Sequence, residues 1–212
     1  MEKLILVRAG RTAWDNENSE NKADPDDRRL QGTLPLPLST EGKEPLRLLA
    51  KHLTEANIKK IYSSGNESSG ATAEFLANIC QVKLKTITDM HELDCGLWQG
   101  LRIADIKQRY GKAFRMWQSD PTSICPPEGE AIENALDRMQ DALKLINRKN
   151  TGKTISIVAA PIAAALIECI LTGKPLNQLW NVIEQEAEMT VFNLTDNGNK
   201  NVPTGTVVVT QE

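Results

Sequence analysis

The sequence predicts an α/β fold, a three-layer α/β/α sandwich around a mostly parallel central sheet. Segments with strand and helix patterns alternate along the chain, as they do in such sandwiches. Segment 4–7 is continuously apolar, which is typical of a strand covered on both faces by helices. A length of 212 residues suits one domain with a full-sized core, so we expect residues 1–212 to form a single domain.

Apolar residues at positions 46, 49, 50 and 53 share one helical face and predict the first helix. Ser39 is its expected N-cap, although Pro45 leaves the start of the helix open. Further strands are expected at 58–62, 82–87, 154–159, 189–194 and 206–210. Further helices are expected at 71–79, at 101–117 with a bend near Gly111, at 131–147, and from Pro161 onwards.

The longest apolar run extends from Ile155 to Leu171. Its length approaches that of a membrane span, but Pro161 and Glu168 interrupt it, so we interpret it as a buried strand followed by a buried helix. The first ten residues become charged too early for a signal peptide. We therefore expect a soluble, cytoplasmic protein without a membrane partner.

The charge and the cysteine content of the chain indicate which classes of partner and cofactor to expect. A net charge of −3 and a pI near 5.6 argue against a nucleic-acid partner, which usually needs a basic face. The four cysteines form neither a CxxC motif nor a Cys/His ligand pattern, so the sequence predicts no metal and no other cofactor. We interpret the cysteines as reduced thiols, with disulfides as the alternative.

An acidic segment lies between Trp14 and Leu30, where the chain reads DNENSENKADPDDRR. With six acidic residues and almost nothing apolar, it cannot bury a core of its own. We therefore expect residues 15–28 to form a mobile, solvated surface loop, with partner binding as the alternative.

Short motifs follow the predicted strands, where ligands bind in open α/β sheets. In chain order they read LVRAGRTAW (6–14), RLQG (29–32), PLSTEG (37–42), IYSS with ATA (61–64 and 71–73), HELDCGLWQG (91–100), PPEGE (126–130) and VAAP (158–161). Together they resemble the signature segments of the histidine phosphatase superfamily, the phosphoglycerate mutase-like proteins. The resemblance covers nearly the whole chain and implies that family's fold, with Trp14 and Trp98 packed around the loops.

The resemblance also implies phosphoryl transfer through a phosphohistidine, for which this chain lacks the histidines. Ala9 stands at the position of the nucleophile, and Ala160 at that of the second histidine, which supports the transferred group. A methyl group cannot attack phosphorus. The chain has two histidines, His52 and His91. Although His91 is conceivable as a replacement nucleophile, we expect both to be surface or packing residues.

Two further positions depart from the family pattern. Ser68 stands where a phosphate-binding arginine is expected, and Asp15 where the family has asparagine, so the pocket loses positive charge and gains negative charge. Arg8 and Glu92 match the family's second arginine and its proposed general acid. We expect Arg8 to form an internal ion pair with Asp15, and a residual anion bridged by Arg8 and Ser68 is the alternative.

The site implied by the resemblance therefore holds no intact catalytic residue and consists of Arg8, Ala9, Asp15, Ser68, Glu92 and Ala160. The leading hypothesis is a catalytically impaired pseudophosphatase with a binding or regulatory role and an unknown protein or small-molecule partner. The alternative is a divergent phosphomonoesterase or mutase that uses Glu92, Arg8 and a water nucleophile. A structural subunit of a larger assembly is the third hypothesis. The oligomeric state does not follow from the sequence.

Overall fold

Strand β1 (Lys3–Arg8) lies inside a six-stranded sheet with the order β3-β2-β4-β1-β5-β6. The computed structural model describes residues 1–15, 25–40, 42–184, 188–194 and 203–207. The other strands are β2 (Lys60–Ser63), β3 (Lys83–Thr86), β4 (Thr154–Ala159), β5 (Met189–Asn193) and β6 (Pro203–Val207). Strands β1 to β4 run parallel, whereas β5 is antiparallel to β1 and β6 to β5, so the sheet is mostly parallel, as the sequence predicts.

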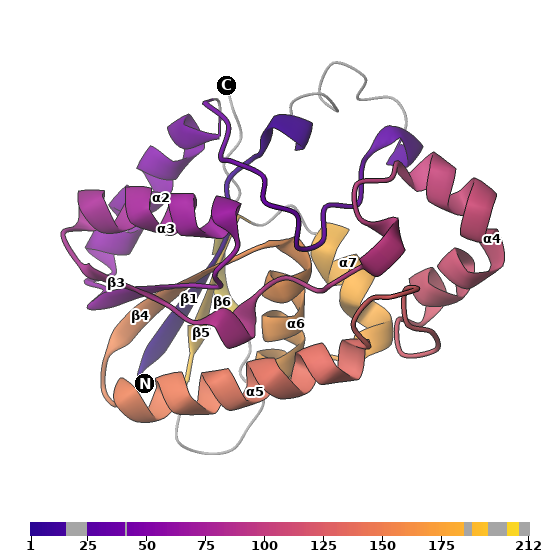
Figure 1. Ribbon diagram of the computed structural model, residues 1–212. Coiled ribbons are helices and arrows are strands. Elements are labelled where there is room, and N and C mark those ends of the chain that lie inside the picture. Colours follow the sequence, from indigo (N-terminus) through magenta and orange to yellow (C-terminus); the bar gives the residue numbers. More distant parts are fainter. Residues whose placement is uncertain (16–24, 41, 185–187, 195–202, 208–212) are drawn as a thin grey trace.

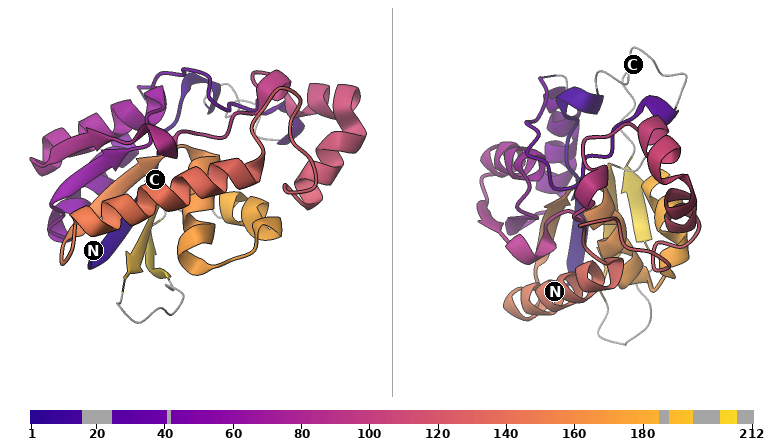
Figure 2. Two further views of the ribbon diagram at one scale, coloured as in Figure 1. Left: turned by 60° about the horizontal axis from the view of Figure 1, so that its bottom comes forward. Right: turned by 45° about the vertical axis from the view of Figure 1, so that its right-hand side comes forward.

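Helices cover both faces of this sheet (Figures 1 and 2). The α-helices are α2 (Lys43–Glu55), α3 (Glu67–Cys80), α4 (Ile103–Ser119), α5 (Ile132–Lys149), α6 (Pro161–Thr172) and α7 (Leu179–Glu184). The short 3-10 helices are η1 (Pro25–Asp27), η2 (Thr88–Met90), η3 (Gly96–Trp98) and η4 (Leu176–Gln178).

Alternating side chains of β1 supply the two halves of the core. Ile5 and Val7 pack with α2 and α3, whereas Leu4 and Leu6 pack with α5 and α6, and all four are buried. This alternation follows from the period of two residues in a strand. Each such side chain contributes about 1.5–3 kcal/mol by leaving water. The predicted three-layer α/β/α sandwich is confirmed.

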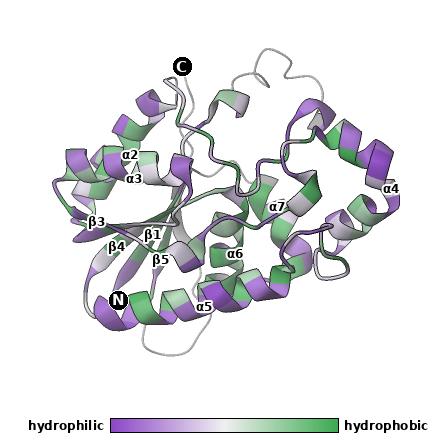
Figure 3. Cartoon of the chain, viewed as in Figure 1, coloured by the Kyte–Doolittle hydropathy of each residue, from purple (hydrophilic) through white to green (hydrophobic). Residues whose placement is uncertain are grey.

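The long apolar run of the sequence forms β4 and α6, as predicted, rather than a single span. Helix α6 is apolar on most of its surface because it lies buried beneath its neighbours, whereas α5 carries an apolar stripe beside a polar one (Figure 3). Within the described ranges, no helix is long and apolar enough to cross a membrane.

Some element boundaries differ from the predicted ones. Gly42 rather than Ser39 is the N-cap of α2, and the Ser39 hydroxyl oxygen accepts the Gly42 N–H at 3.0 Å. Helix α3 begins at Glu67, and the break in α4 is at Tyr110, with φ −126° and ψ 26°, one residue before the glycine. Strand β6 begins at Pro203, while positions 208–210 of the predicted strand lie outside the described residues.

The prediction of a mobile acidic loop at 15–28 is wrong for residues 25–28, and residues 16–24 lie outside the described ranges. Helix η1 is held against α4 by an ion pair between Asp26 and Lys107, while Asp27 lies 3.8 Å from Arg102. The carbonyl oxygen of Arg28 accepts the N–H of Ile103 at 2.8 Å. The basic residues of α4 are distant in sequence, so composition alone did not reveal this docking.

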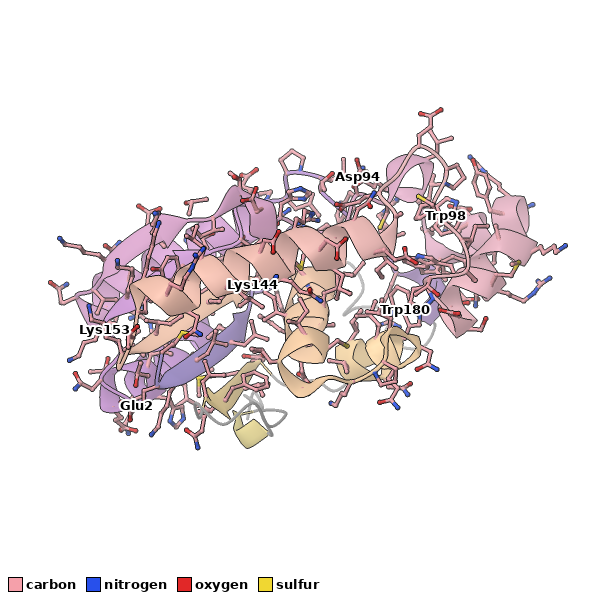
Figure 4. The ribbon with its side chains drawn as sticks, turned by 90° about the horizontal axis from the view of Figure 1, so that it is seen from below. Glu2, Asp94, Trp98, Lys144, Lys153 and Trp180 are labelled. Carbon is pink, nitrogen blue, oxygen red and sulfur yellow. The ribbon has the colours of Figure 1, made fainter. Side chains whose placement is uncertain are left out.

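An aromatic cluster fixes α4 to the rest of the molecule. The ring of Trp98 lies 5.6 Å from that of Phe114 and 5.4 Å from that of Trp117, which in turn lies 4.3 Å from the ring of Trp180. Figure 4 shows Trp98 and Trp180 at one end of the molecule, away from Glu2 and Lys153. The predicted packing of Trp98 is confirmed. Trp14 is half-buried and lies 5.7 Å from the Arg29 guanidinium.

Candidate functional site

Strands β1 and β4 end side by side, because Arg8 and Ala159 are partners in their parallel ladder. The next residues, Ala9 and Ala160, therefore lie together beyond the carboxyl edge of the sheet, and the Ala9 N–H donates to the carbonyl oxygen of Ala159 at 2.8 Å. This edge is where open α/β sheets bind ligands.

A cleft of about 330 Å³ opens at the end of β1. Of the residues expected from the sequence, Arg8, Ala9, Asp15 and Ser68 line it. Ala160 and Glu92 do not line the cleft, and both are 2% exposed. The structure thus gathers four of the six expected residues around one cavity and buries the other two.

Two glycines let the turn after β1 pack against the start of α2. A Cβ at Gly10 would lie 2.7 Å from Cδ1 of Leu38, and a Cβ at Gly42 would lie 2.7 Å from the carbonyl oxygen of Arg11. The second clash is with backbone, which cannot move aside cheaply. These glycines therefore set the shape of the cleft wall.

Arg8 does not pair with Asp15, so that hypothesis is wrong. Its guanidinium donates to the carbonyl oxygen of Ile183 at 2.7 Å and to that of Val182, at the carboxyl end of α7. Burial lowers the pKa of Arg8, while the charge of Glu168 raises it. The partners of Arg8 lie 175 and 174 residues away in sequence, which is why the sequence did not reveal them.

Asp15 instead closes a helical turn at residues 13–15. Its Oδ2 accepts the N–H of Thr12 at 2.7 Å and the Thr12 hydroxyl at 2.8 Å. This is the carboxylate half of a capping box, in which a side chain in the first turn binds the N-cap backbone. The carboxylate at this position therefore stabilises local structure at the rim of the cleft.

Ser68 lies in the first turn of α3, with its side chain in the cleft wall. Its carbonyl oxygen accepts the Thr72 hydroxyl at 2.7 Å, and Thr72 Oγ1 accepts the N–H of Gly10 at 2.9 Å. These contacts tie α3 to the turn after β1. A serine hydroxyl here can hydrogen-bond a ligand but supplies no positive charge.

Glu92 is sealed behind the cleft and caps α6. Its carboxylate accepts the N–H of Ile162 at 2.8 Å, that of Ala163 at 2.9 Å and that of Leu93 at 2.8 Å. Burial raises the pKa of Glu92 to about 7, although the three amide donors act in the opposite direction. A carboxylate beside helix amides is favoured by the helix dipole as well.

Two amides of the first turn of α6 are consequently engaged within the protein. Pro161 has no N–H, and the amides of Ile162 and Ala163 donate to Glu92. The next amide, of Ala164, donates to the carbonyl oxygen of Ala160 at 2.8 Å. Helix N-termini are common phosphate sites, but here the Glu92 carboxylate accepts the amides of Ile162 and Ala163.

Comparison with known proteins identifies the family. The pattern of the histidine phosphatase superfamily (branch 1) matches residues 4–204. The chain belongs to this superfamily. It is 26% identical over 199 residues to phosphoserine phosphatase 1 of Hydrogenobacter thermophilus, covering 94% of this chain and 90% of that protein.

Solved structures of the histidine phosphatase fold superpose on nearly the whole chain. Bacillus stearothermophilus YhfR has a TM-score of 0.82 at 23% identity, with 98% of both chains covered. A mycobacterial glucosyl-3-phosphoglycerate phosphatase has a TM-score of 0.78 at 19% identity, with both chains fully covered at 100%. These likenesses confirm the phosphoglycerate mutase-like fold.

In this member of the histidine phosphatase superfamily, Arg138 of α5 holds the segment that carries Glu92. Its guanidinium donates to both carboxylate oxygens of Glu130 at 2.7 Å and to the carbonyl oxygens of Asp89 and His91 at 2.9 and 2.8 Å. The side chain of His91 does not line the cleft, and its Nδ1 lies 2.7 Å from its neighbour's carbonyl oxygen. It is a packing residue, as expected.

Sequence reasoning missed further residues of the cleft, above all Arg11 and Glu188. Arg11 follows the first motif directly, and that adjacency could have revealed it. Glu188 comes to the cleft because its carbonyl oxygen accepts the Arg8 N–H at 2.9 Å, at the start of the antiparallel β5. Burial raises the pKa of Glu188, whereas Arg11 lowers it.

Throughout the described part of the chain, His, Cys, Asp and Glu side chains form no group that could hold a metal ion. Cys80, Cys95, Cys125 and Cys169 all lie in that part and are free thiols.

Proposed function

We propose that this chain is a pseudophosphatase, a histidine phosphatase superfamily member that has lost phosphoryl transfer and kept its cleft for binding or regulation. The observation that carries the proposal lies at the amino terminus of α6, where Glu92 takes the amides of Ile162 and Ala163, and the N-cap position holds Ala160.

Two requirements of phosphohistidine chemistry support this proposal. The nucleophile needs an imidazole, and Ala9 offers a methyl group. The transferred phosphoryl group needs preorganised donors, but the amides of Ile162 and Ala163 donate to Glu92, and Nη1 and Nη2 of Arg8 donate to carbonyl groups of α7. Losing one such donor typically costs about 3 kcal/mol of transition-state stabilisation.

The alternative, a divergent phosphomonoesterase or mutase with a water nucleophile, would need Glu92 as its acid. A general acid must reach the leaving oxygen within hydrogen-bonding distance. Glu92 is 2% exposed, does not line the cleft, and accepts three backbone amides. The phosphatase relative supports descent from an enzyme, while the position of Glu92 favours the pseudophosphatase.

The same proposal includes a single domain, which is supported by one sheet whose strands span residues 3–207. It also includes a cytoplasmic location, which the four free thiols support.

The test compares hydrolysis of p-nitrophenyl phosphate by the wild-type chain and by the triple revertant Ala9→His, Ser68→Arg, Ala160→His. We expect the wild type to remain at the background rate measured with buffer and with a mock purification. Turnover in the wild type that is lost in Glu92→Ala, with that variant shown to be folded by circular dichroism, would establish the enzymatic alternative. Activity gained only in the revertant would support loss of chemistry on an intact scaffold.

A further inference from the structure

We propose that the cleft binds a small zwitterion carrying an ammonium and a carboxylate group, the chemical class of free amino acids. The inference rests on the proposed function, because it takes the cleft to have exchanged phosphate ester turnover for reversible binding. It names the ligand class of that same site.

Two opposite charges face the cleft from different segments. Arg11 lies on the turn after β1, and Glu188 directly precedes β5. The charge of Arg11 acts on Glu188, yet among the described residues the two side chains form no ion pair with each other. Backbone contacts on each side hold their segments: Ser39 N–H donates to the Arg11 carbonyl oxygen at 2.8 Å.

Separated charges of this kind match a ligand that carries both signs. A half-buried carboxylate that lacks a direct partner is poorly compensated for its lost hydration, and an ammonium group restores that compensation. A guanidinium binds a carboxylate through paired hydrogen bonds. Glu188 therefore suits the ammonium end of the ligand, and Arg11 suits the carboxylate end.

A third polar group lies between cleft and core. Ser68 is 2% exposed and lines the cleft, and within the described residues its hydroxyl makes no hydrogen bond. The Ser68 hydroxyl can donate to a carboxylate or accept from an ammonium group, so it suits either end of a zwitterion.

The charges of the cleft favour a zwitterion over phosphate. Glu188 and Asp15 bring negative charge to a lining that also holds Arg11, while the Arg8 guanidinium donates to the end of α7, so the lining carries both signs. A volume of about 330 Å³ lies near the lower end of small-molecule sites, which run from about 300 to 1,000 Å³. The ligand class is therefore small and carries both charges.

The experiment is isothermal titration calorimetry of the full chain with each of the twenty free amino acids, and with acetate, methylammonium and inorganic phosphate as single-charge probes. We expect saturable binding of at least one amino acid, and binding at least tenfold weaker for acetate and methylammonium. Glu188→Gln and Arg11→Gln should each weaken the binding at least tenfold. The matched controls Glu133→Gln and Arg47→Gln, both exposed and away from the cleft, should bind as the wild type does.

The inference is overturned if no amino acid binds, if inorganic phosphate binds more tightly than every amino acid, or if the two cleft variants bind unchanged. Near-ultraviolet circular dichroism of each variant separates a lost site from a lost fold, and Arg11→Lys should recover part of the affinity. Wild-type hydrolysis of the aryl phosphate would instead overturn the proposed function, so the two failures are distinguishable.

Discussion

The ends of β1 and β4 lie side by side, yet the two have opposite fates. At the end of β4, Glu92 occupies the amides of α6 and leaves the site of Ala160 buried. At the end of β1, Ala9 opens onto a cleft in which Arg11 and Glu188 remain apart. Ala160 therefore lies at a buried position, where the Glu92 carboxylate accepts helix amides. Ala9 lies at an open cleft, where the charged side chains of Arg11 and Glu188 do not pair with each other.

The largest effect is expected from removing the Glu92 carboxylate that caps α6. Glu92→Ala leaves three buried amides without their acceptor and opens space at the start of α6, so we expect a loss of about 4 kcal/mol in the free energy of unfolding. Urea denaturation measures the loss, with exposed Glu133→Ala as the control. A loss below about 1 kcal/mol would contradict the role of Glu92 as the α6 cap.

The pH dependence of stability sharpens the same point. In the folded protein the pKa of Glu92 is raised to about 7. The contribution of this raised pKa to the free energy of unfolding is therefore fully present below the ordinary pKa of a glutamate and is lost as the pH rises through 7. We expect the stability of the wild type minus that of Glu92→Gln to fall by about 3 kcal/mol between acidic and mildly alkaline pH. Denaturation curves measured across that range test this, and a difference that rises with pH would show that the amides dominate over burial.

A smaller effect is expected at Arg8, the last residue of β1. Arg8→Ala removes the donors to the last carbonyl groups of α7, whose oxygens can then bind water, so we expect a loss of about 2 kcal/mol. Hydrogen exchange of the α7 amides should rise while exchange in α3 stays unchanged. Equal protection in wild type and variant would mean that Arg8 does not hold α7.

The smallest effect lies at the rim of the open cleft. Asp15→Ala removes the acceptor for Thr12, and loss of such a cap costs about 1 kcal/mol. Asp15→Asn keeps a carbonyl acceptor and should cost less than half as much. Thermal denaturation compares the two variants, and equal losses would show that charge rather than hydrogen bonding makes Asp15 stabilising.

Much of the fold could be predicted from local pattern. The apolar run of β1, the stripe of α5 and Pro161 at the start of α6 each reflect an interaction within a few residues, so they are legible in sequence. The docking of η1 on α4 was not legible, because Asp26 and Lys107 lie 81 residues apart and charge composition does not reveal pairing.

For the candidate site, the residue identities were evident in the sequence, whereas the positions of the side chains were not. Alanines at positions 9 and 160, and thus the absence of imidazole from both motifs, were evident in the sequence itself, as was the identity of the family. Where the side chains of Arg8, Asp15 and Glu92 point was decided only by the tertiary structure. Glu92 binds amides 70 and 71 residues away, and a backbone N–H is present in nearly every residue type, so its capture by a carboxylate leaves no mark in a sequence.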